Sequence, residues 1–390
     1  MGYDLGKIIH PVATETFFSE HFESRVLHVP RADRSYYKEL LSADEIDRVL
    51  TTLHLMHPSV TMVNAAKELK TEDYCYSSGL IDAARLFQEY AEGGTIVLNN
   101  LEMSLPSLAD LCRAMEGEFS HRFQCNIYVT PVSAQGLKTH YDSHDVFVLQ
   151  IEGTKHWKIY DTPVERPLRG QEFQPGKFTP GEVTMEFDLQ PGDMVYVPRG
   201  VMHDASGAEG DSIHITLGIL PNTWTDLMLE AVAKVALEDP ELRRSLPVGF
   251  ARTDYDRAEA RATFKQLLHR VVEKADVDAA LDHFAGDLVS TRHPLIYGQM
   301  RQINKLASIK IDDRASARPH ILYHLRTDGD KVVLAAYGGE IRLPEHAREP
   351  LEHALTHEGY RIGDLPGELD DAGKLVLIRR LVREGLVRLL

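Results

Sequence analysis

The spacing of hydrophobic and polar residues changes twice along this chain of 390 residues. Up to about residue 110 the pattern is mixed and mainly helical. Ser42–Glu45 has the S-x-x-E spacing of a capping box directly before an apolar helical repeat. Ser107–Asp110 has a similar spacing of a hydroxyl and a carboxylate. We therefore expect helices to begin at both points.

From about residue 119 to residue 220 the pattern becomes that of short strands. Six runs rich in β-branched and aromatic residues are separated by Gly and Pro: FQCNIYVTP, DVFVLQI, HWKIYD, VTMEFDL, DMVYVP and SIHITLGI. Many short strands with turn signals between them are typical of an all-β sandwich or barrel. The double-stranded jelly roll, which includes the cupins, is one such architecture.

After Pro221 the pattern is helical again, and the final ninety residues differ once more. Residues 225–247 and 256–289 carry apolar side chains at spacings of three and four. In the last part, HILYHLRTDGDKVVLAAYGGEIRLP predicts strands joined by a DGD turn, followed by two helices in EHAREPLEHALTH and DDAGKLVLIRRLVREG. Strands and short helices at this size resemble a winged-helix module.

Composition places the chain among ordinary globular proteins, with 43% hydrophobic and 26% charged residues. Its three cysteines, Cys75, Cys112 and Cys125, include no C-x-x-C pair. This excludes a disulfide framework and a cysteine-based zinc site. The sequence shows neither an apolar run of membrane-spanning length nor a secretory signal. We therefore expect a cytoplasmic protein that does not enter a membrane.

The formal net charge of −16 is distributed unevenly. Residues 301–390 hold 15 Lys and Arg against 14 Asp and Glu, which leaves 28 basic and 45 acidic residues in the first 300. This balance argues against nucleic-acid binding, which needs a basic surface. The acidity serves either solubility alone or the attraction of a basic partner.

Candidate metal chemistry begins with His140 and Asp142, which share one face of an extended segment because they are two residues apart. His203, in GDMVYVPRGVMH, follows 63 residues later and supplies a third ligand. Two histidines and one carboxylate form the facial triad of non-haem Fe(II) oxygenases. The chain has 19 histidines, so an H-x-D pair alone arises easily by chance. The neighbouring His144 and Asp145 leave other ligand pairs open.

Three stretches together resemble a known family: NIYVTP, HYDSHDVFVLQIEGTKHWKIYD and GDMVYVPRGVMHDA. They are similar to the JmjC-type cupin oxygenases of the ribosomal-oxygenase branch. The resemblance is close over about 100 residues and extends, through the order of the domains, over most of the chain. It implies an α+β fold with three parts. These are a double-stranded β-helix (jelly-roll, cupin) catalytic domain at residues 1–221, a helical dimerisation segment at 222–300 and a winged-helix-like domain at 301–390.

The resemblance assigns the metal ligands. It implies that His140, Asp142 and His203 are the catalytic residues and hold Fe(II). Two aromatic residues of the same stretch, Phe147 and Trp157, are better explained as core packing.

The resemblance also assigns a cosubstrate site. Lys155 would form an ion pair with the distal carboxylate of 2-oxoglutarate, which suits a compact cation in an apolar barrel. Tyr128 and Thr216 match family positions that hydrogen-bond the same carboxylate, although both also fit an ordinary core. Asn126 precedes Tyr128 by two residues, so it shares the strand face and would also line the pocket.

The function that these features favour is an Fe(II)- and 2-oxoglutarate-dependent oxygenase. Its substrate would be a histidine or arginine of a basic protein such as a ribosomal protein, and the enzyme would be a homodimer. One alternative keeps the chemistry but acts on a ribosomally made peptide natural product or a small molecule, which would not need the C-terminal parts. Another is a non-enzymatic, metal-binding cupin that serves as an interaction protein. The presence of all three ligands and Lys155 argues against this last interpretation.

Overall fold

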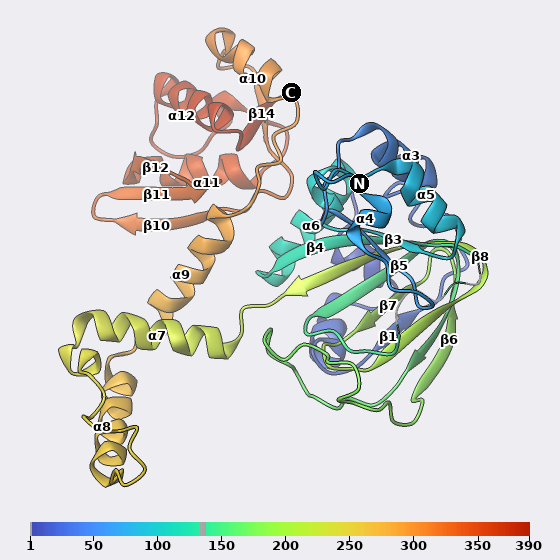
Figure 1. The fold of residues 1–390 in the computed structure, drawn as a ribbon. Coiled ribbons are helices and arrows are strands. Elements are labelled where there is room, and N and C mark those ends of the chain that lie inside the picture. Colours follow the sequence, from blue (N-terminus) through green and yellow to red (C-terminus); the bar gives the residue numbers. More distant parts are fainter. Residues whose placement is uncertain (1, 133, 135–137) are drawn as a thin grey trace. The chain divides into compact units, whose positions relative to one another are not determined.

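The computed structural model describes residues 2–132, 134 and 138–390 (Figure 1). The chain forms two compact units, residues 1–221 and 222–390. Helices and strands are mixed in both, which confirms the expected α+β class. Within the described residues, no helix combines the length and the apolar character that crossing a membrane requires.

The first unit is built on an eight-stranded sheet in which β8 lies between β4 and β5. Seven strands follow the order β1-β7-β5-β8-β4-β3-β2, and β6 pairs with β5 beside this path. All described pairings in this sheet are antiparallel. The strands are β1 (Leu27–Val29), β2 (Val60–Val63), β3 (Thr95–Leu98), β4 (Arg122–Thr130), β5 (Asp145–Ile159), β6 (Met185–Leu189), β7 (Met194–Val197) and β8 (His203–Leu220).

The strand runs predicted from the sequence all lie in strands of this sheet. Two of them, DVFVLQI and HWKIYD, belong to the single long strand β5, which pairs with β8 along almost its whole length. Alternate side chains of β5 and β8 therefore face the interior of one curved sheet. Because the sheet is curved, both ends of β5 and of β8 lie around the same interior space.

The pairing of β5 with β8 contains three register shifts, between Gln150 and Lys155. Gly153 lies within this irregular stretch at φ +64°, and a Cβ atom there would come within 1.9 Å of the Asp211 carbonyl oxygen. Only glycine fits this bulge. The shifts change which face the following residues occupy: Val146 and Val148 face the interior before the bulge, and odd-numbered residues face it afterwards.

The N-terminal part contributes the helices that cover this sheet and also three strands, β1 to β3, which the sequence pattern did not predict. The Ser42 hydroxyl accepts a hydrogen bond from the Glu45 amide at 3.3 Å, as expected for a helix start. The second predicted start is wrong in detail. Helix α6 begins at Pro106, and the Ser107 hydroxyl donates to the Leu40 carbonyl instead. The helical elements are α1 (Leu5–Ile9), α2 (Thr14–Thr16), η1 (Phe17–His21), α3 (Ala43–Thr52), α4 (Thr71–Tyr74), α5 (Ala83–Ala91), η2 (Leu101–Met103) and α6 (Pro106–Phe119).

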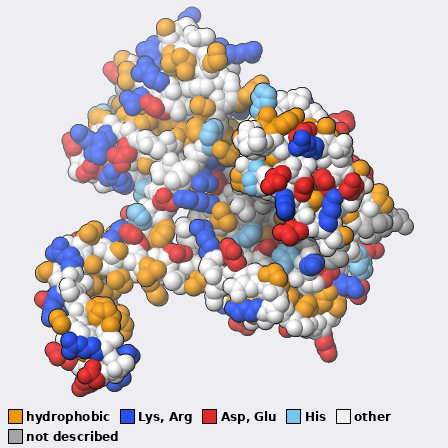
Figure 2. All heavy atoms as spheres, viewed as in Figure 1, with side chains coloured by type: hydrophobic (Ala, Val, Ile, Leu, Met, Phe, Trp, Pro, Cys, Tyr) orange, Lys and Arg blue, Asp and Glu red, His pale blue; other side chains and the backbone are white. Residues whose placement is uncertain are grey.

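The second unit begins with helices and continues with two small sheets. The helical part comprises α7 (Trp224–Glu238), η3 (Pro240–Arg243), α8 (Ala258–Lys274), α9 (Val277–Ser290), α10 (Gln299–Lys305) and η4 (Leu306–Ser308). Helix α8 has no buried residue, and Figure 2 shows hydrophobic side chains on the surface of this helical part. An amphipathic helix with an exposed apolar stripe normally has a partner surface.

The remainder of the second unit packs around its own hydrophobic core. Strands β10 (His324–Asp328), β11 (Lys331–Ala336) and β12 (Gly339–Pro344) form one sheet, and the predicted DGD turn joins the first two. Strands β13 (Tyr360–Arg361), β9 (Arg314–Ala317) and β14 (Val387–Leu389) form the other. The helical elements are η5 (Glu345–Ala347), α11 (Arg348–Thr356), η6 (Ile362–Asp364) and α12 (Asp371–Arg383).

Candidate functional site

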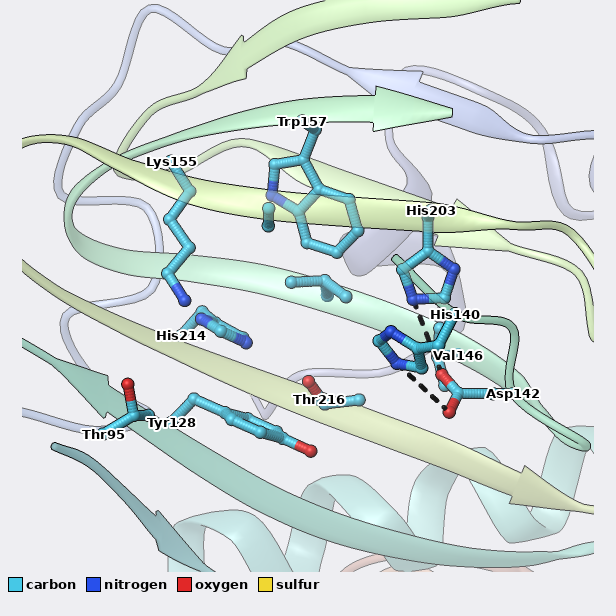
Figure 3. Close-up of a pocket in the computed structure, with 12 residues that line it drawn as sticks. Thr95, Tyr128, His140, Asp142, Val146, Lys155, Trp157, His203, His214 and Thr216 are labelled. Carbon is cyan, nitrogen blue, oxygen red and sulfur yellow. Dashed lines mark ion pairs between the residues drawn. The ribbon is translucent and has the colours of Figure 1, made fainter. Parts of the chain in front are cut away.

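Three predicted ligands converge at one end of the sheet. The metal-binding atoms of His140, Asp142 and His203 all lie within 4.8 Å of one another. The Asp142 carboxylate faces both imidazoles, with Oδ1 3.8 Å from Nε2 of His140 and Oδ2 3.7 Å from Nε2 of His203 (Figure 3). His203 begins β8, and a bridge between His140 and His203 ties the preceding loop to that strand. The fold thereby brings together residues 63 positions apart.

Backbone carbonyls orient both imidazoles. Nδ1 of His140 lies 2.8 Å from the Lys138 oxygen, and Nδ1 of His203 lies 3.0 Å from the Val201 oxygen. A proton on each Nδ1 completes these hydrogen bonds and leaves the lone pair of Nε2 directed at Asp142. Burial, followed by the neighbouring His140, lowers the pKa of His203 to about 4. The donor set is therefore two imidazoles, of which His203 is held neutral, and one carboxylate, which suits ferrous iron.

The structure separates the neighbouring candidate Asp145 from this cluster. Asp145 is fully buried, accepts a hydrogen bond from the Tyr196 hydroxyl at 2.7 Å and pairs with Nη1 of Arg199 at 2.7 Å. The same Arg199 nitrogen lies 2.6 Å from a carboxylate oxygen of Glu23. Asp145 thus belongs to a buried ion-pair network. His144 packs against Gly218 and is not part of the three-residue cluster.

A cavity of about 90 Å³ extends from the three ligands into the sheet. Figure 3 shows the ligands at one end and Lys155 with His214 at the other. Several apolar and hydroxyl side chains complete the wall. The lining residues are Thr95, Tyr128, His140, Asp142, Val146, Val148, Lys155, Trp157, His203, Ala205, His214 and Thr216.

Lys155 is a buried cation at the inner end, with only 4% of its surface exposed. Its ammonium donates a hydrogen bond to the Thr130 hydroxyl at 3.1 Å. Burial lowers the pKa of Lys155 to about 8, because the charged form loses hydration that one hydroxyl does not replace. No described residue forms an ion pair with this cation, and an anionic ligand in the cavity would supply a counter-ion.

The other predicted cosubstrate residues divide into two groups. Tyr128 and Thr216 line the cavity, and burial raises the pKa of the Tyr128 phenol, which stays protonated and able to donate. Asn126 lies outside the lining among the described residues, so the expectation that it lines the pocket is wrong. Its Oδ1 accepts a hydrogen bond from the Asn100 amide at 3.0 Å, which turns the side chain to a neighbouring loop.

Sequence reasoning overlooked Thr95, Trp157 and His214 in this cavity. Phe147 is a core residue as expected, but Trp157 both packs in a core cluster and stacks on His203, with ring centroids 5.7 Å apart. His214 precedes Thr216 by two residues on β8, so strand alternation from Thr216 could have identified it. Thr95 lies on β3, and no local sequence pattern shows that β3 borders this cavity.

A second, larger cavity of about 920 Å³ opens on the outer side of the ligands. His140 and Asp142 line both cavities, so the three-residue cluster lies between them. Phe173 and Phe178 also line the outer cavity and pack against the buried Tyr141, at ring distances of 5.4 and 5.5 Å. A site with a small inner chamber and a larger outer one can hold a small cosubstrate and admit a larger molecule.

Residues 98–227 match the protein-family model described as JmjC domain. This segment is similar to JmjC domains. It contains most of the strands that carry the site and all three clustered ligands.

Curated relatives are similar over most of the chain. The bifunctional lysine-specific demethylase and histidyl-hydroxylase NO66 of Aedes aegypti is 30% identical over 71% of this chain and 46% of its own length. Ribosomal oxygenase 1 of Danio rerio is 29% identical over 72% of the chain and 55% of its length. NO66 of Dictyostelium discoideum is 28% identical over 98% and 82%. The chain spans about half the length of the first two.

Among solved structures, the ribosomal oxygenase YcfD of Escherichia coli aligns with 100% of both chains at a TM-score of 0.57 and 16% identity. A structure of YcfD with cobalt and 2-oxoglutarate covers 97% of this chain at a TM-score of 0.55 and 14% identity. At this identity the likeness shows the fold alone.

Proposed function

We propose that this protein is an Fe(II)- and 2-oxoglutarate-dependent oxygenase that hydroxylates a histidine or arginine side chain of a basic protein. The observation that carries the proposal is one cavity with two imidazoles and a carboxylate at one end and, at the other, a lysine without an ion-pair partner among the described residues. Relatives bearing the names ribosomal oxygenase and histidyl-hydroxylase support it. So does a solved neighbour that holds cobalt and 2-oxoglutarate.

The residues of the chain divide the work between them. His140, Asp142 and His203 would hold the iron, and Lys155, with the hydroxyls of Tyr128 and Thr216, would hold the far carboxylate of the cosubstrate. With dioxygen and 2-oxoglutarate, bound ferrous iron would supply the chemistry that inserts one oxygen atom into an unactivated C–H bond, while the other oxygen atom enters the succinate formed as 2-oxoglutarate loses CO2. The inner cavity excludes bulk water, and the outer cavity leaves room for a peptide segment.

The proposal is tested by incubating the purified protein with Fe(II), ascorbate and 2-oxoglutarate and measuring succinate. Mass spectrometry of proteins from cells with and without the enzyme then identifies targets by the added mass of one oxygen atom. Absence of both succinate formation and 2-oxoglutarate binding would contradict the proposal. A modified small molecule or natural-product peptide would favour the alternative substrate.

We expect capture of the substrate to depend on salt. The first 300 residues carry a net charge of −17, from 28 basic and 45 acidic residues, so a cationic protein is attracted over a long range. Raising the ionic strength from well below to well above the physiological value, where the screening length is about 8 Å, should lower kcat/KM roughly tenfold. The measurement is a salt series with the identified substrate. A flat series, or a neutral or acidic substrate, would show that the charge serves solubility only.

We further propose that residues 222–300 form a dimerisation segment and residues 301–390 a winged-helix-like domain. Large apolar side chains on α7 and α8 are exposed: Trp224 at 73%, Met228 at 61% and Phe264 at 62% of their surface. A second copy of the same face would bury them symmetrically, as in most homo-oligomers.

The dimer is expected to be stable at micromolar concentration, and light scattering should give twice the chain mass of 43.9 kDa. The substitutions Met228→Asp and Phe264→Asp should produce monomers, because each would bury an unpaired carboxylate in the interface. Met103→Asp is the matched control, since Met103 is 65% exposed on the first unit. A monomeric wild type would contradict this proposal.

A further inference from the structure

His214 is a buried histidine on β8, the strand that pairs with both β4 and β5. It lies opposite Tyr128 in one pairing and Gln150 in the other. The imidazole stacks on the Tyr128 ring with centroids 4.8 Å apart and planes 5° apart. Figure 3 shows it in the inner cavity between Lys155 and Tyr128.

Most polar groups around His214 have hydrogen-bond partners, but Nδ1 of His214, Oε1 of Gln150 and Nε1 of Trp157 have none within the described residues. Lys155 donates to the Thr130 hydroxyl, and the Thr95 hydroxyl donates to the same oxygen at 3.3 Å. The Gln150 amide nitrogen donates to the Ser212 hydroxyl and to two carbonyls. Within the described part of the chain, Nδ1 of His214 is buried and has no hydrogen-bond partner. Buried polar groups normally have partners, so an unpaired one at a cavity wall indicates a ligand.

The imidazole is neutral. Burial, followed by the charge of Lys155, holds the pKa of His214 well below its ordinary value. A neutral imidazole keeps one N–H donor and adds no second charge beside the lysine. A carboxylate offers several lone-pair positions, more than one ammonium can fill. Lys155 therefore provides the positive charge at this end of the cavity. The N–H group of His214 is placed to donate a hydrogen bond in a defined direction.

We propose that His214 donates a hydrogen bond to the same distal carboxylate of 2-oxoglutarate that Lys155 pairs with, and thereby selects for 2-oxo acids that end in a second carboxylate. This inference rests on the proposed function. It assigns His214 as a specificity-determining residue of the cosubstrate site, next to Tyr128 and Thr216. The competing role is packing alone, in which any flat ring on Tyr128 would serve equally.

Two substitutions separate these roles. His214→Phe keeps a flat ring that can stack on Tyr128 but removes the donor. His214→Gln removes the ring but keeps an N–H donor. Each variant is loaded with Mn(II) without oxygen, its metal content and Tm are measured, and 2-oxoglutarate is titrated by calorimetry. The matched ligand is 2-oxovalerate, which has the same five-carbon chain without the second carboxylate.

The expected result is a loss of 2-oxoglutarate affinity of about tenfold or more in His214→Phe, as for a hydrogen bond to a charged group. Affinity for 2-oxovalerate should be unchanged, and His214→Gln should recover part of the loss. Wild-type affinity for 2-oxoglutarate in His214→Phe would overturn the inference, as would an equal loss for both ligands. If the wild type itself does not bind 2-oxoglutarate, the proposed function is contradicted. The wild-type titration therefore separates failure of the proposed function from failure of this inference.

Discussion

Replacing Asp142 with alanine is expected to abolish 2-oxoglutarate turnover and to weaken iron binding by more than about a hundredfold, since even partners outside the ligand shell contribute ten- to a hundredfold. The carboxylate lies opposite both imidazoles, at 3.8 and 3.7 Å, and is the only anion of the cluster of three. Without it, only the two imidazole rings remain and the charge of the ion is uncompensated. Metal titration under anaerobic conditions measures the loss.

Asp145→Asn is the matched control, because it changes the neighbouring carboxylate and is expected to lower stability without affecting iron binding. Asp145 pairs with the buried Arg199, and removing one partner of a buried ion pair costs about 3–5 kcal/mol. We expect Asp145→Asn to lower Tm and leave the iron stoichiometry of the folded protein unchanged. Full iron binding in Asp142→Ala would mean that another carboxylate serves as ligand.

The second large effect is expected at Lys155. Lys155→Ala should weaken 2-oxoglutarate binding by about one to two orders of magnitude, which corresponds to a charged hydrogen bond of about 1.5–3 kcal/mol. Calorimetry on the metal-loaded protein measures the affinity. The control is Lys158→Ala, since Lys158 lies on the same strand but is 39% exposed at its side chain and pairs with Glu186. Unchanged affinity in Lys155→Ala would show that another residue anchors the cosubstrate.

The lowered pKa of Lys155 adds a test by pH. With a pKa of about 8 in the free protein, the amine is charged below that pH and loses its proton above it. Binding of the dianion requires the charged amine, so wild-type affinity should be constant below about pH 8 and should fall above it. The limit is tenfold per pH unit. Lys155→Ala should lack this decline, and a flat wild-type profile to pH 9.5 would contradict the assignment.

The sequence predicted the central strands because each strand is a local signal, and it marked His140, Asp142 and His203 as candidate ligands, which the family resemblance selected from their neighbours. His140 and Asp142 share a face by simple alternation, and His203 follows a recognisable turn. Packing decides the features that were missed. Strands β1, β2 and β3 are short and lie toward the two ends of the sheet order, where only their partners identify them as strands. By strand alternation, Asn126 lies on the strand face that borders the cavity. Its side chain instead accepts a hydrogen bond from a loop amide.

Lys155 shows a further limit of alternation, because it faces the cavity only through the register shifts that precede it. Without them, the even-numbered positions that begin with Val146 and Val148 would continue inward. His156, which now lies outside between Asp188 and Glu186, would then point into the cavity. The length of the stretch between Gln150 and Lys155 is therefore under stronger constraint than the identity of most of its side chains. An insertion or deletion of a single residue there would exchange the inner and outer surfaces of the rest of the strand. We therefore expect most substitutions in this stretch to be tolerated better than an insertion or a deletion.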